Sequence, residues 1–378
     1  MTPLLTFCEE HLDQTVDTIE ALVRLESPST DKTAVDRCGY ALATRLRRLG
    51  ARVDAIPQTT CGDHLRAELT GTQGRVLLLG HFDTVWPVGT LARMPLETRE
   101  GRLHGPGAFD MKAGIALALT GIEALRASRG ECPSIVMLWT TDEEVGSVSS
   151  RALIEAEARR ADAVLVLEPA LPGGALKTSR KGCGEFEVTV TGVAAHAGVD
   201  PGKGASAVHE LARQILTIER LQDLARGISV NVGVVAGGTR GNVVAEEARA
   251  VVDVRVPTRE DGRRIEEAFG RLQPEDRRTR LMMKGGFSRP PLERTAAVEG
   301  LFRLAHEAAS GLGHDLAEGA TGGGSDGNFT AALGIPTLDG LGATGDGAHA
   351  QHEHVVVADL PWRAALIAAL LERLARLG

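Results

Sequence analysis

The first half of the chain alternates short apolar runs with longer stretches in which apolar residues recur every three or four positions. The longer stretches predict helices, and the short runs predict strands. Helices are expected over residues 5–25, 33–49 and 112–128, and strands over residues 76–80, 135–141 and 163–167. Short strands between helices are typical of a mostly parallel sheet covered by helices, so this region is predicted to be α/β. Ligands of such sheets bind beyond the carboxyl ends of the strands, and we expect a site there.

The pattern changes near Gly182, where apolar and polar residues begin to alternate. This alternation over residues 185–190 is followed by a predicted helix over 206–224, strands over 228–235 and 248–256, and a helix over 261–272. Such an order describes a strand-helix-strand-strand-helix module, which we interpret as a small α+β sandwich.

The glycine- and proline-rich residues 285–291 predict turns after this module. Helix and strand patterns then resume up to a C-terminal helix over residues 362–377. We therefore predict two domains, as a chain of 378 residues favours. The first is a discontinuous α/β domain of residues 1–181 and 288–378, and the second is the module of residues 182–287 inserted into it.

Composition narrows the class of partner. Hydrophobic residues make up 43% of the chain and charged residues 24%, the balance of a chain that buries a substantial core. The net charge of -8 and the pI near 5.8 argue against a nucleic-acid partner, because phosphate binding needs a concentrated basic surface. A peptide or small-molecule substrate is expected instead.

The start of the chain and the shortness of its apolar runs predict a cytoplasmic location. Residues 1–20 lack the basic-then-apolar order of a secretory signal, and no run approaches the roughly eighteen apolar residues of a membrane span. Five cysteines, odd in number and without CxxC spacing, predict neither a disulfide framework nor a sulfur-ligated zinc. They are Cys8, Cys38, Cys61, Cys132 and Cys183.

Candidate chemistry begins where the predicted strand 76–80 ends. His81 and Asp83 are two residues apart and face the same side of an extended chain, so Asp83 can hold one ring nitrogen while the other binds a metal. A capped turn is the alternative reading of this pair. Asp110 follows a glycine-rich bend just before the predicted helix 112–128, where it could equally serve as a helix N-cap.

More carboxylates follow the next two predicted strands. Glu143 and Glu144 come after residues 135–141, and as adjacent extended residues they should point in opposite directions and do different jobs. Acids at a helix start are otherwise ordinary dipole partners. Glu168 ends the strand 163–167, where packing explains a carboxylate poorly.

Three histidines are the last candidates in this set. His349, His352 and His354 stand in a glycine-rich segment far downstream, and three such residues could also be a solvated cluster without a function. Two histidines and three carboxylates make a ligand mix that Zn²⁺, Co²⁺ or Mn²⁺ accepts. Two zinc ions would balance Asp110, Glu144, Glu168 and one hydroxide, so such a site could be buried without net charge.

Seven segments in order carry a family resemblance. They are GHFDTV, GPGAFDMKAG, TTDEEVGS, LEPA, AAHAG, TGGGSDGN and GDGAHAQHEHV, which run from about residue 78 to 356. Together they resemble the co-catalytic zinc peptidases and deacylases, a family that includes glutamate carboxypeptidase, acetylornithine deacetylase, succinyl-diaminopimelate desuccinylase and the aminoacylases. LEP and TGGGSD are most similar to the glutamate carboxypeptidase branch.

The resemblance implies a role for each candidate. One zinc takes His81 and Glu168, the other takes Glu144 and His349, and Asp110 bridges them. His349 is preferred to His352 and His354 because Glu353 and Val355 then match the family spacing HxxxExV. Glu143 is implied as the general base that takes a proton from the metal-bridging water, and Asp83 as the residue that orients His81. The Asp110 to Met111 peptide is cis in relatives.

The inserted module is implied to be a lid and dimerisation domain with site residues of its own. His196 resembles the lid histidine that reaches across a homodimer to stabilise the oxyanion. A turn histidine and solvated strand arginines are the alternative readings of this part of the chain. The implied substrate-binding residues are Asn242, Arg255, Arg289, Gly323 and Ser325. Within that set, Arg255 could grip a carboxylate and the glycine run could form a nest of backbone N–H groups.

Three hypotheses for function follow. The favoured one is a two-metal amidohydrolase that releases a C-terminal, glutamate-like amino acid from peptides or N-acyl conjugates. The second is an N-acyl-amino-acid deacylase of the acetylornithine deacetylase type, because the segment from Ser179 to Gly182 is similar to the deacylase branches. The third is a catalytically inactive dimeric binding module. Retention of Glu143 and of all five implied ligands speaks against the third.

Overall fold

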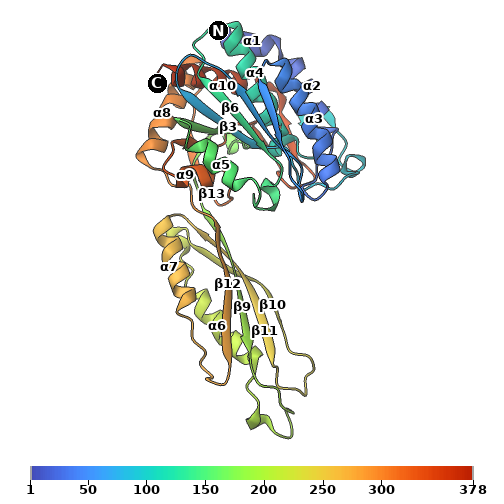
Figure 1. Ribbon diagram of the computed structural model, residues 1–378, viewed down its shortest axis with the longest axis vertical. Coiled ribbons are helices and arrows are strands. Elements are labelled where there is room, and N and C mark those ends of the chain that lie inside the picture. The colour runs from blue at the N-terminus through green and yellow to red at the C-terminus, as the bar shows by residue number, and fades with distance from the viewer. Residues whose placement is uncertain (1, 377–378) are drawn as a thin grey trace. The chain divides into compact units, whose positions relative to one another are not determined.

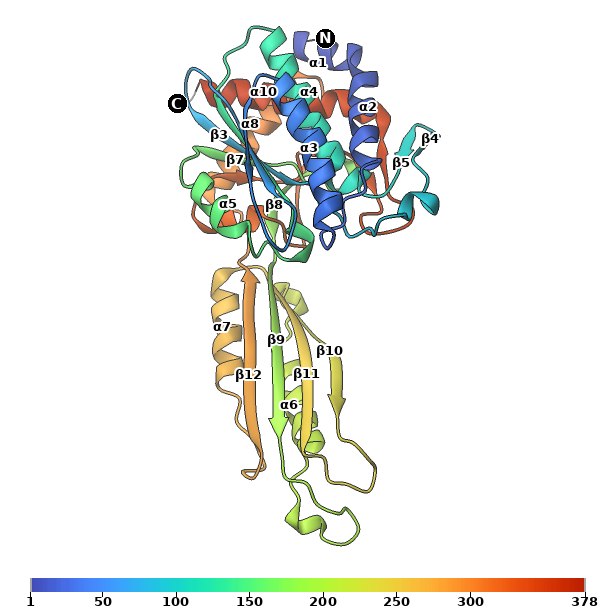
Figure 2. The same ribbon diagram turned by 45° about the vertical axis from the view of Figure 1, so that its right-hand side comes forward.

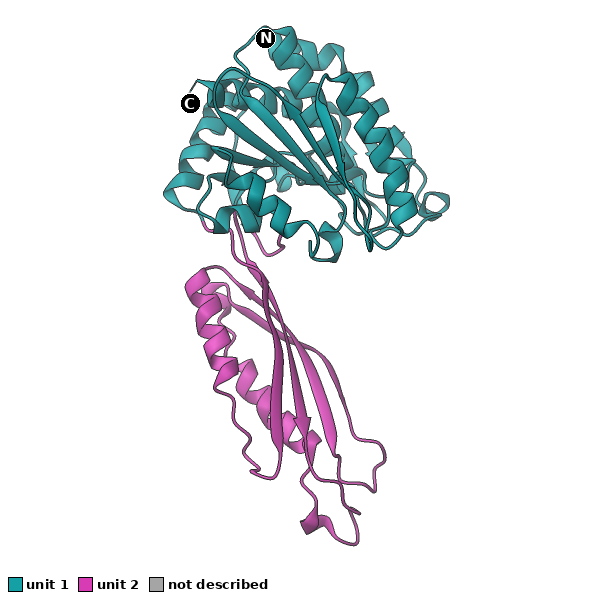
Figure 3. Ribbon diagram, viewed as in Figure 1, with its two compact units in different colours: residues 1–178, 294–320, 325–378 teal, residues 179–293, 321–324 magenta. Residues whose placement is uncertain are grey.

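The computed structural model describes residues 2–376 (Figure 1), and its chain divides into two compact units (Figure 3). Unit 1 comprises residues 1–178, 294–320 and 325–378, and unit 2 comprises residues 179–293 and 321–324. Unit 2 extends beyond the predicted insertion 182–287 on both sides. In the described part of the chain, no helix is long and apolar enough to cross a membrane.

Unit 1 is built on a six-stranded sheet with the order β1-β2-β6-β3-β7-β14. The strands are β1 (Arg52–Ile56), β2 (His64–Leu69), β3 (Arg75–His81), β6 (Ser134–Thr140), β7 (Ala163–Val166) and β14 (Thr337–Leu338). The pairs of β3 with β6, β3 with β7, and β7 with β14 are parallel, whereas β1 and β2 join as an antiparallel edge. The predicted α/β class with a mostly parallel sheet is confirmed, and the antiparallel edge is new.

Alternate residues of the central strands face two different helical layers, as the period of a strand requires. Val76 and Leu78 of β3 belong to the larger apolar core, whereas Leu77 and Leu79 belong to a smaller one. Helices of the larger core are α1 (Pro3–Glu10), α2 (Leu12–Val23), α3 (Lys32–Arg48), α4 (Ala113–Ala127), α8 (Ala296–Gly311) and α10 (Leu360–Ala375). Helices α5 (Arg151–Ala158) and α9 (Gly327–Ala332) cover the other face.

Short strands form two further small sheets. A small antiparallel sheet has the order β15-β16-β5-β4, and β8 pairs with β13. Their bounds are Gly345–Asp346 (β15), His354–Val356 (β16), Arg102–His104 (β5), Glu97–Arg99 (β4), Leu176–Arg180 (β8) and Glu318–Thr321 (β13). The pairing of β16 with β5 joins the histidine-rich segment to the stretch that precedes Asp110.

The prediction of one helix over residues 5–25 is wrong. The segment forms α1 and α2, which break at His11, where φ is -108° and ψ is 16°. The ring Nδ1 of His11 lies 2.8 Å from the Phe7 carbonyl oxygen and interacts with the end of α1. At the other terminus, the predicted helix 362–377 corresponds to α10, and Leu377 lies outside the described residues.

Unit 2 contains a four-stranded antiparallel sheet with the order β10-β11-β9-β12 (Figure 2). The strands are β9 (Gly182–Thr191), β10 (Ser229–Gly237), β11 (Glu247–Val256) and β12 (Arg280–Arg289), with helices α6 (Ala207–Glu219) and α7 (Arg259–Gly270). Phe186, Val188 and Val190 are buried with apolar residues of both helices. The alternation in the sequence therefore marks the face of the sheet that the helices cover.

The prediction of turns over residues 285–291 is wrong for most of that range, because β12 runs to Arg289. Its glycines serve a close strand pairing instead of a turn. A Cβ on Gly285 would lie 2.1 Å from the carbonyl oxygen of Glu185 in β9, and Gly285 has a φ of +98°. Only glycine adopts such a conformation without strain, which allows the irregular strand to stay paired.

Candidate metal centre

Asp110 lies in a tight turn, Ala108–Lys112, directly before α4. Its φ of -114° and ψ of 95° are not helical, and the peptide bond to Met111 is cis. The buried carboxylate of Glu353 holds this turn in place. It accepts hydrogen bonds from the backbone N–H groups of Gly107 (3.0 Å), Phe109 (2.9 Å) and Asp110 (3.1 Å).

His81 is the last residue of β3 and is only 1% exposed. Its Nδ1 lies 3.0 Å from the carbonyl oxygen of Asp83 and 3.4 Å from the Asp83 carboxylate. Asp83 in turn accepts a hydrogen bond of 2.7 Å from the Ser29 hydroxyl. These contacts fix the ring so that Nε2 faces the carboxylates of Asp110 and Glu168.

The two carboxylate oxygens of Asp110 face two different histidines. Oδ1 lies 3.3 Å from Nε2 of His81, which is also 3.4 Å from the carboxylate of Glu168. Oδ2 lies 3.3 Å from Nε2 of His349, which is also 3.0 Å from the carboxylate of Glu144. Asp110 thus stands between two half-sites, each with one imidazole and one further acid.

The sequence suggested that Glu143 and Glu144 are extended, but they form a 3-10 turn with Val145. The two side chains still take different positions. Glu144 lies against His349, whereas ligand atoms of Glu143, His81 and Glu168 lie within 4.8 Å of one another. Glu143 is therefore close to the half-site of His81.

Three atoms of this cluster are buried and have no hydrogen-bond partner among residues 2–376. They are Nε2 of His81, Oδ1 of Asp110 and Oε1 of Glu144. Buried polar atoms are rarely left unpaired, because an unmade hydrogen bond costs about 1 to 3 kcal/mol. Imidazole nitrogens and carboxylate oxygens that converge on one space fit a zinc-like divalent ion.

The ionisation of the cluster calls for positive charge. Burial opposes the charged form of His81, but nearby carboxylates, Asp110 first, outweigh it and hold the pKa of His81 well above its ordinary value. Hydrogen bonds to Asp110 and Glu144 raise the pKa of His349 to about 10. Burial raises the pKa of Glu144, with His349 opposing the shift. The carboxylates of the cluster outnumber its cationic groups, and a bound cation would balance the excess negative charge.

The other two histidines of the downstream segment lie elsewhere. His352 is exposed and its Nε2 is 3.9 Å from the carboxylate of Asp346. His354 packs against His104 with ring centroids 5.1 Å apart. His349, with a φ of +62° and a side chain that is 51% exposed, is the histidine that reaches Asp110.

In unit 2, the structure brings His196 and Asn242 together. The carbonyl oxygen of Asn242 accepts a hydrogen bond of 3.0 Å from Ala197. Nδ1 of His196 accepts hydrogen bonds from the backbone N–H groups of Gly198 (3.1 Å) and Val199 (3.2 Å). Nδ1 is therefore unprotonated, and a neutral ring carries its proton on Nε2, on an exposed side chain.

The guanidinium of Arg255, predicted to grip a substrate carboxylate, contacts two residues of unit 2. Its guanidinium already makes two hydrogen bonds to Asp253, of 2.9 and 2.7 Å, and a third contact to the sulfur of Cys183. Arg289 is buried in β12 opposite Cys183. Both arginines stay predictions for contact with the substrate.

The glycine run is held through its carbonyl groups. Arg180 is buried and donates to the carbonyl oxygens of Gly323 (3.1 Å) and Gly324 (3.0 Å). Ser325 is fully buried, and its hydroxyl donates to Asp339 over 2.6 Å. The structure gives Ser325 a role in the turn, and its predicted contact with the substrate stays a prediction.

The sequence pattern did not identify two residues that hold these sites in place. Glu353 entered the sequence comparison only through the HxxxExV spacing, although a lone acid between two histidines was a usable signal. Arg180 entered only as part of the segment that is similar to the deacylase branches. Neither residue has a sequence neighbour that reveals its partners, since Glu353 contacts the turn of Asp110 and Arg180 contacts Gly323 and Gly324.

The chain is similar to several characterised proteins. Carboxypeptidase G2 of Pseudomonas sp. (strain RS-16) is 30% identical over 370 residues, which cover 94% of this chain and 88% of that protein. Succinyl-diaminopimelate desuccinylase of Cupriavidus necator is 28% identical and covers 94% of this chain and 97% of that protein. The crystal structure of aminopeptidase PepT from Bacillus cereus shares the fold, with a TM-score of 0.81, 24% identity and coverage of 96% of this chain and 99% of that one.

The family model described as Peptidase family M20/M25/M40 matches residues 77–373, a range that contains every residue of the cluster around Asp110. The suspected family of zinc peptidases and deacylases is thereby confirmed. The chain belongs to Peptidase family M20/M25/M40.

Proposed function

We propose that this protein is a two-metal amidohydrolase that releases a C-terminal, glutamate-like amino acid from a peptide or an N-acyl conjugate. The family is metal-dependent, and its members act on peptides or acyl-amino acids. The observation that carries the proposal is Asp110, whose two oxygens each face a histidine and a second acid.

The ligand set divides between two ions. His81 and Glu168 would hold the first and Glu144 and His349 the second, with Asp110 shared. When bound, divalent ions of this kind polarise a scissile carbonyl and lower the pKa of water towards about 7. Zn²⁺ fits the mixed nitrogen and oxygen ligands, and Co²⁺ or Mn²⁺ would fit them as well.

Glu143 is the proposed general base. It adjoins Glu144 in the 3-10 turn and lies within 4.8 Å of ligand atoms of His81 and Glu168. From there its carboxylate would take the proton of the attacking water and pass it to the leaving nitrogen. This same proximity would also allow Glu143 to bind a metal. We assign it proton transfer because each half-site already has one histidine, one acid and a share of Asp110.

His196 is the proposed donor to the oxyanion. Two backbone N–H groups hold its Nδ1, so Nε2–H is free to donate to a negative oxygen. We propose that it does so across a homodimer formed through unit 2, with Asn242 beside it. Arg289 and the segment of Gly323 remain candidates for contact with the substrate carboxylate.

An N-acyl-amino-acid deacylase is the second candidate. The observation in its favour is that acetylornithine deacetylase of Myxococcus xanthus is 36% identical over 192 residues, or 47% of this chain. The third hypothesis, an inactive binding module, has no support, since Glu143 and all the proposed ligands are present.

The experiment combines metal analysis with a substrate panel. Purified protein should hold at least two zinc-class ions per chain, and it should hydrolyse acyl-glutamates and dipeptides faster than acetylornithine. His349→Asn should abolish turnover, and His352→Asn, three residues away and exposed, should leave it unchanged. Turnover of acetylornithine alone would favour the deacylase. A protein that binds metal and hydrolyses no amide would refute both candidates.

A further inference from the structure

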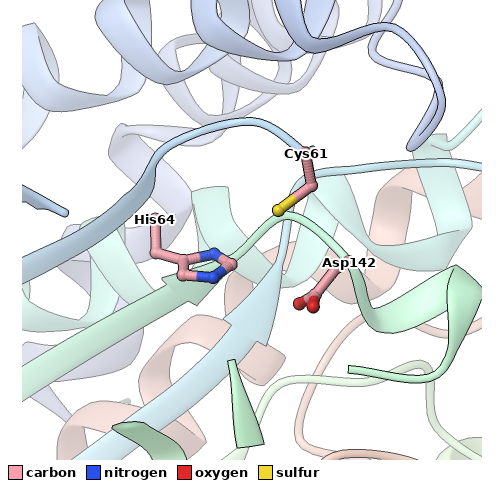
Figure 4. Close-up of side chains that lie close together, drawn as sticks. All are labelled: Cys61, His64 and Asp142. Carbon is pink, nitrogen blue, oxygen red and sulfur yellow. The ribbon is translucent and has the colours of Figure 1, made fainter. Parts of the chain in front are cut away.

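A second cluster of metal-ligating side chains lies in unit 1, apart from Asp110. It consists of Cys61, His64 and Asp142 (Figure 4), whose ligand atoms lie within 4.8 Å of one another. His64 begins β2, and Asp142 follows the end of β6, so the antiparallel pairing of these strands brings both to one edge of the sheet. Figure 4 shows the sulfur, the imidazole and the carboxylate directed towards a common space.

A serine hydroxyl lies against all three side chains. Ser149 Oγ is 3.2 Å from Cys61 Sγ, 3.0 Å from His64 Nε2 and 2.7 Å from Asp142 Oδ2. The other oxygen of Asp142, Oδ1, is buried and has no hydrogen-bond partner among residues 2–376. This cluster therefore contains an acceptor that the protein alone does not satisfy.

Hydrogen-bond directions fix the orientation of the His64 ring. Thr141 donates its hydroxyl proton to the Gly62 carbonyl oxygen, so it can only accept from His64 Nδ1, 2.9 Å away. His64 then carries its proton on Nδ1, and the lone pair of Nε2 points into the cluster. Asp142 Oδ2 also accepts hydrogen bonds from the backbone N–H groups of Ser149 (2.7 Å) and Ser150 (3.3 Å), so the hydroxyl proton of Ser149 is available to that lone pair. Oδ1 of Asp142 is the acceptor that a cation in the cluster would satisfy.

Burial excludes a nucleophilic role for the thiol. Cys61 is 5% exposed, His64 0% and Asp142 3%. A catalytic cysteine must meet a substrate, and reactive cysteines sit in partly exposed surroundings. Structural metal sites, by contrast, are closed.

We propose that Cys61, His64 and Asp142 form a further metal site, closed to solvent, for a zinc-class divalent ion, with the Ser149 hydroxyl as the fourth group. A thiolate, an imidazole and a carboxylate are the ligands that zinc takes in tetrahedral sites. Binding releases the proton of the Cys61 thiol to solvent. The site shares no residue with the two half-sites of Asp110.

The position of the proposed metal site in the fold gives its ion a structural role. Asp142 directly precedes Glu143, and its carbonyl oxygen accepts a hydrogen bond of 2.7 Å from Ser147 N–H. A metal held by Asp142, by His64 at the start of β2 and by Cys61 in the loop before it would tie the 3-10 turn of Glu143 to the edge of the sheet. Spacing in the sequence predicted no sulfur-ligated zinc, because Cys61 and Asp142 come from different strand ends.

Cobalt binding tests the proposal without reference to activity. Metal-free wild-type protein titrated with Co²⁺ should develop a near-ultraviolet thiolate-to-cobalt charge-transfer band. None of the proposed ligands around Asp110 is a thiolate, so that cluster cannot produce this band. Cys61→Ser should remove it, whereas Cys132→Ser, a half-buried thiol outside the cluster, should keep it. His64→Asn should weaken the cobalt affinity by more than the roughly tenfold that loss of a supporting residue costs.

Zinc content provides a second readout. Wild type should hold one zinc ion more than Cys61→Ser, with both proteins folded by circular dichroism. A folded wild-type protein that shows no thiolate band would overturn the proposal whatever the variants do. A band that persists in Cys61→Ser would overturn it too, and would assign the sulfur to another cysteine.

Discussion

Buried carboxylates occur in both units, and they are satisfied in different ways. In unit 2, Glu210 is fully buried and accepts four hydrogen bonds: from Gln214 (2.7 Å), Arg213 (2.9 Å) and the backbone N–H groups of Glu275 (3.0 Å) and Asp276 (3.1 Å). In unit 1, Oδ1 of Asp110 and Oε1 of Glu144 are buried without a partner among the described residues. The folded chain completes the surroundings of Glu210 and leaves those of Asp110 and Glu144 incomplete.

The difference separates a structural acid from a ligand. A buried carboxylate with every oxygen bonded holds segments of chain together and needs nothing further. One with an orphaned oxygen is stable only when something else supplies positive charge. Asp142 combines both conditions, since Ser149 bonds one of its oxygens and the other is orphaned. Four substitutions test this distinction.

The largest effect is expected for Asp110→Asn. Loss of the shared carboxylate should remove both half-sites at once, so amide hydrolysis should fall to background and metal content should drop. Asp346→Asn, an exposed acid of the downstream segment, is the matched control and should keep both. Activity of Asp110→Asn above about a tenth of wild type would contradict the bridging role.

Glu143→Gln should lower kcat by about 10² to 10⁴, the usual contribution of a general acid or base. Metal content should not change, because Glu143 is not one of the proposed ligands. Steady-state kinetics beside elemental analysis check both points. A variant that loses metal together with activity would show that Glu143 is a ligand instead.

Glu353→Gln should lower metal affinity or kcat by about 10 to 100-fold, since the residue acts only through the turn of Asp110. An amide cannot accept from Gly107, Phe109 and Asp110 without turning its own N–H groups towards them. Metal titration is the measurement. Wild-type affinity in this variant would show that the turn holds its shape unaided.

Glu210→Gln should leave the metal centre intact and should lower the free energy of unfolding at neutral pH by about 1 to 3 kcal/mol. Burial opposes ionisation of Glu210, but hydrogen bonds from Gln214, Asp276 and Glu275 outweigh it and hold its pKa below the ordinary 4.5. The stabilisation is therefore complete above about pH 4.5 and is lost as the pH falls through the lowered pKa.

Denaturant unfolding of both proteins across that range checks this prediction. The stability difference between wild type and Glu210→Gln should shrink as the pH is lowered below about 4.5. Glu247→Gln, an exposed acid in β11, should show no such dependence. A constant difference at every pH would mean that packing, and not charge, accounts for the loss.

The sequence predicted the α/β class and which polar residues follow the strands. Strand periodicity and turn residues are local properties, so β3, β6 and β7 could be found within a few residues of their ends. The sequence pattern does not reveal the antiparallel strands β1 and β2, and it predicts turns over the last residues of β12. Their pairing depends on partners far along the chain, and the glycines of β12 have meaning only beside β9.

What the sequence alone determined is the order of the motifs, and with it the family and the residues worth testing. Tertiary structure decided which atoms meet. It turned His349 and not His352 towards Asp110, engaged the guanidinium of Arg255 with Asp253, and gathered Cys61, His64 and Asp142. The physical reason is that a charged or ligating side chain takes its role from groups within about 4 Å, and long-range packing chooses those groups.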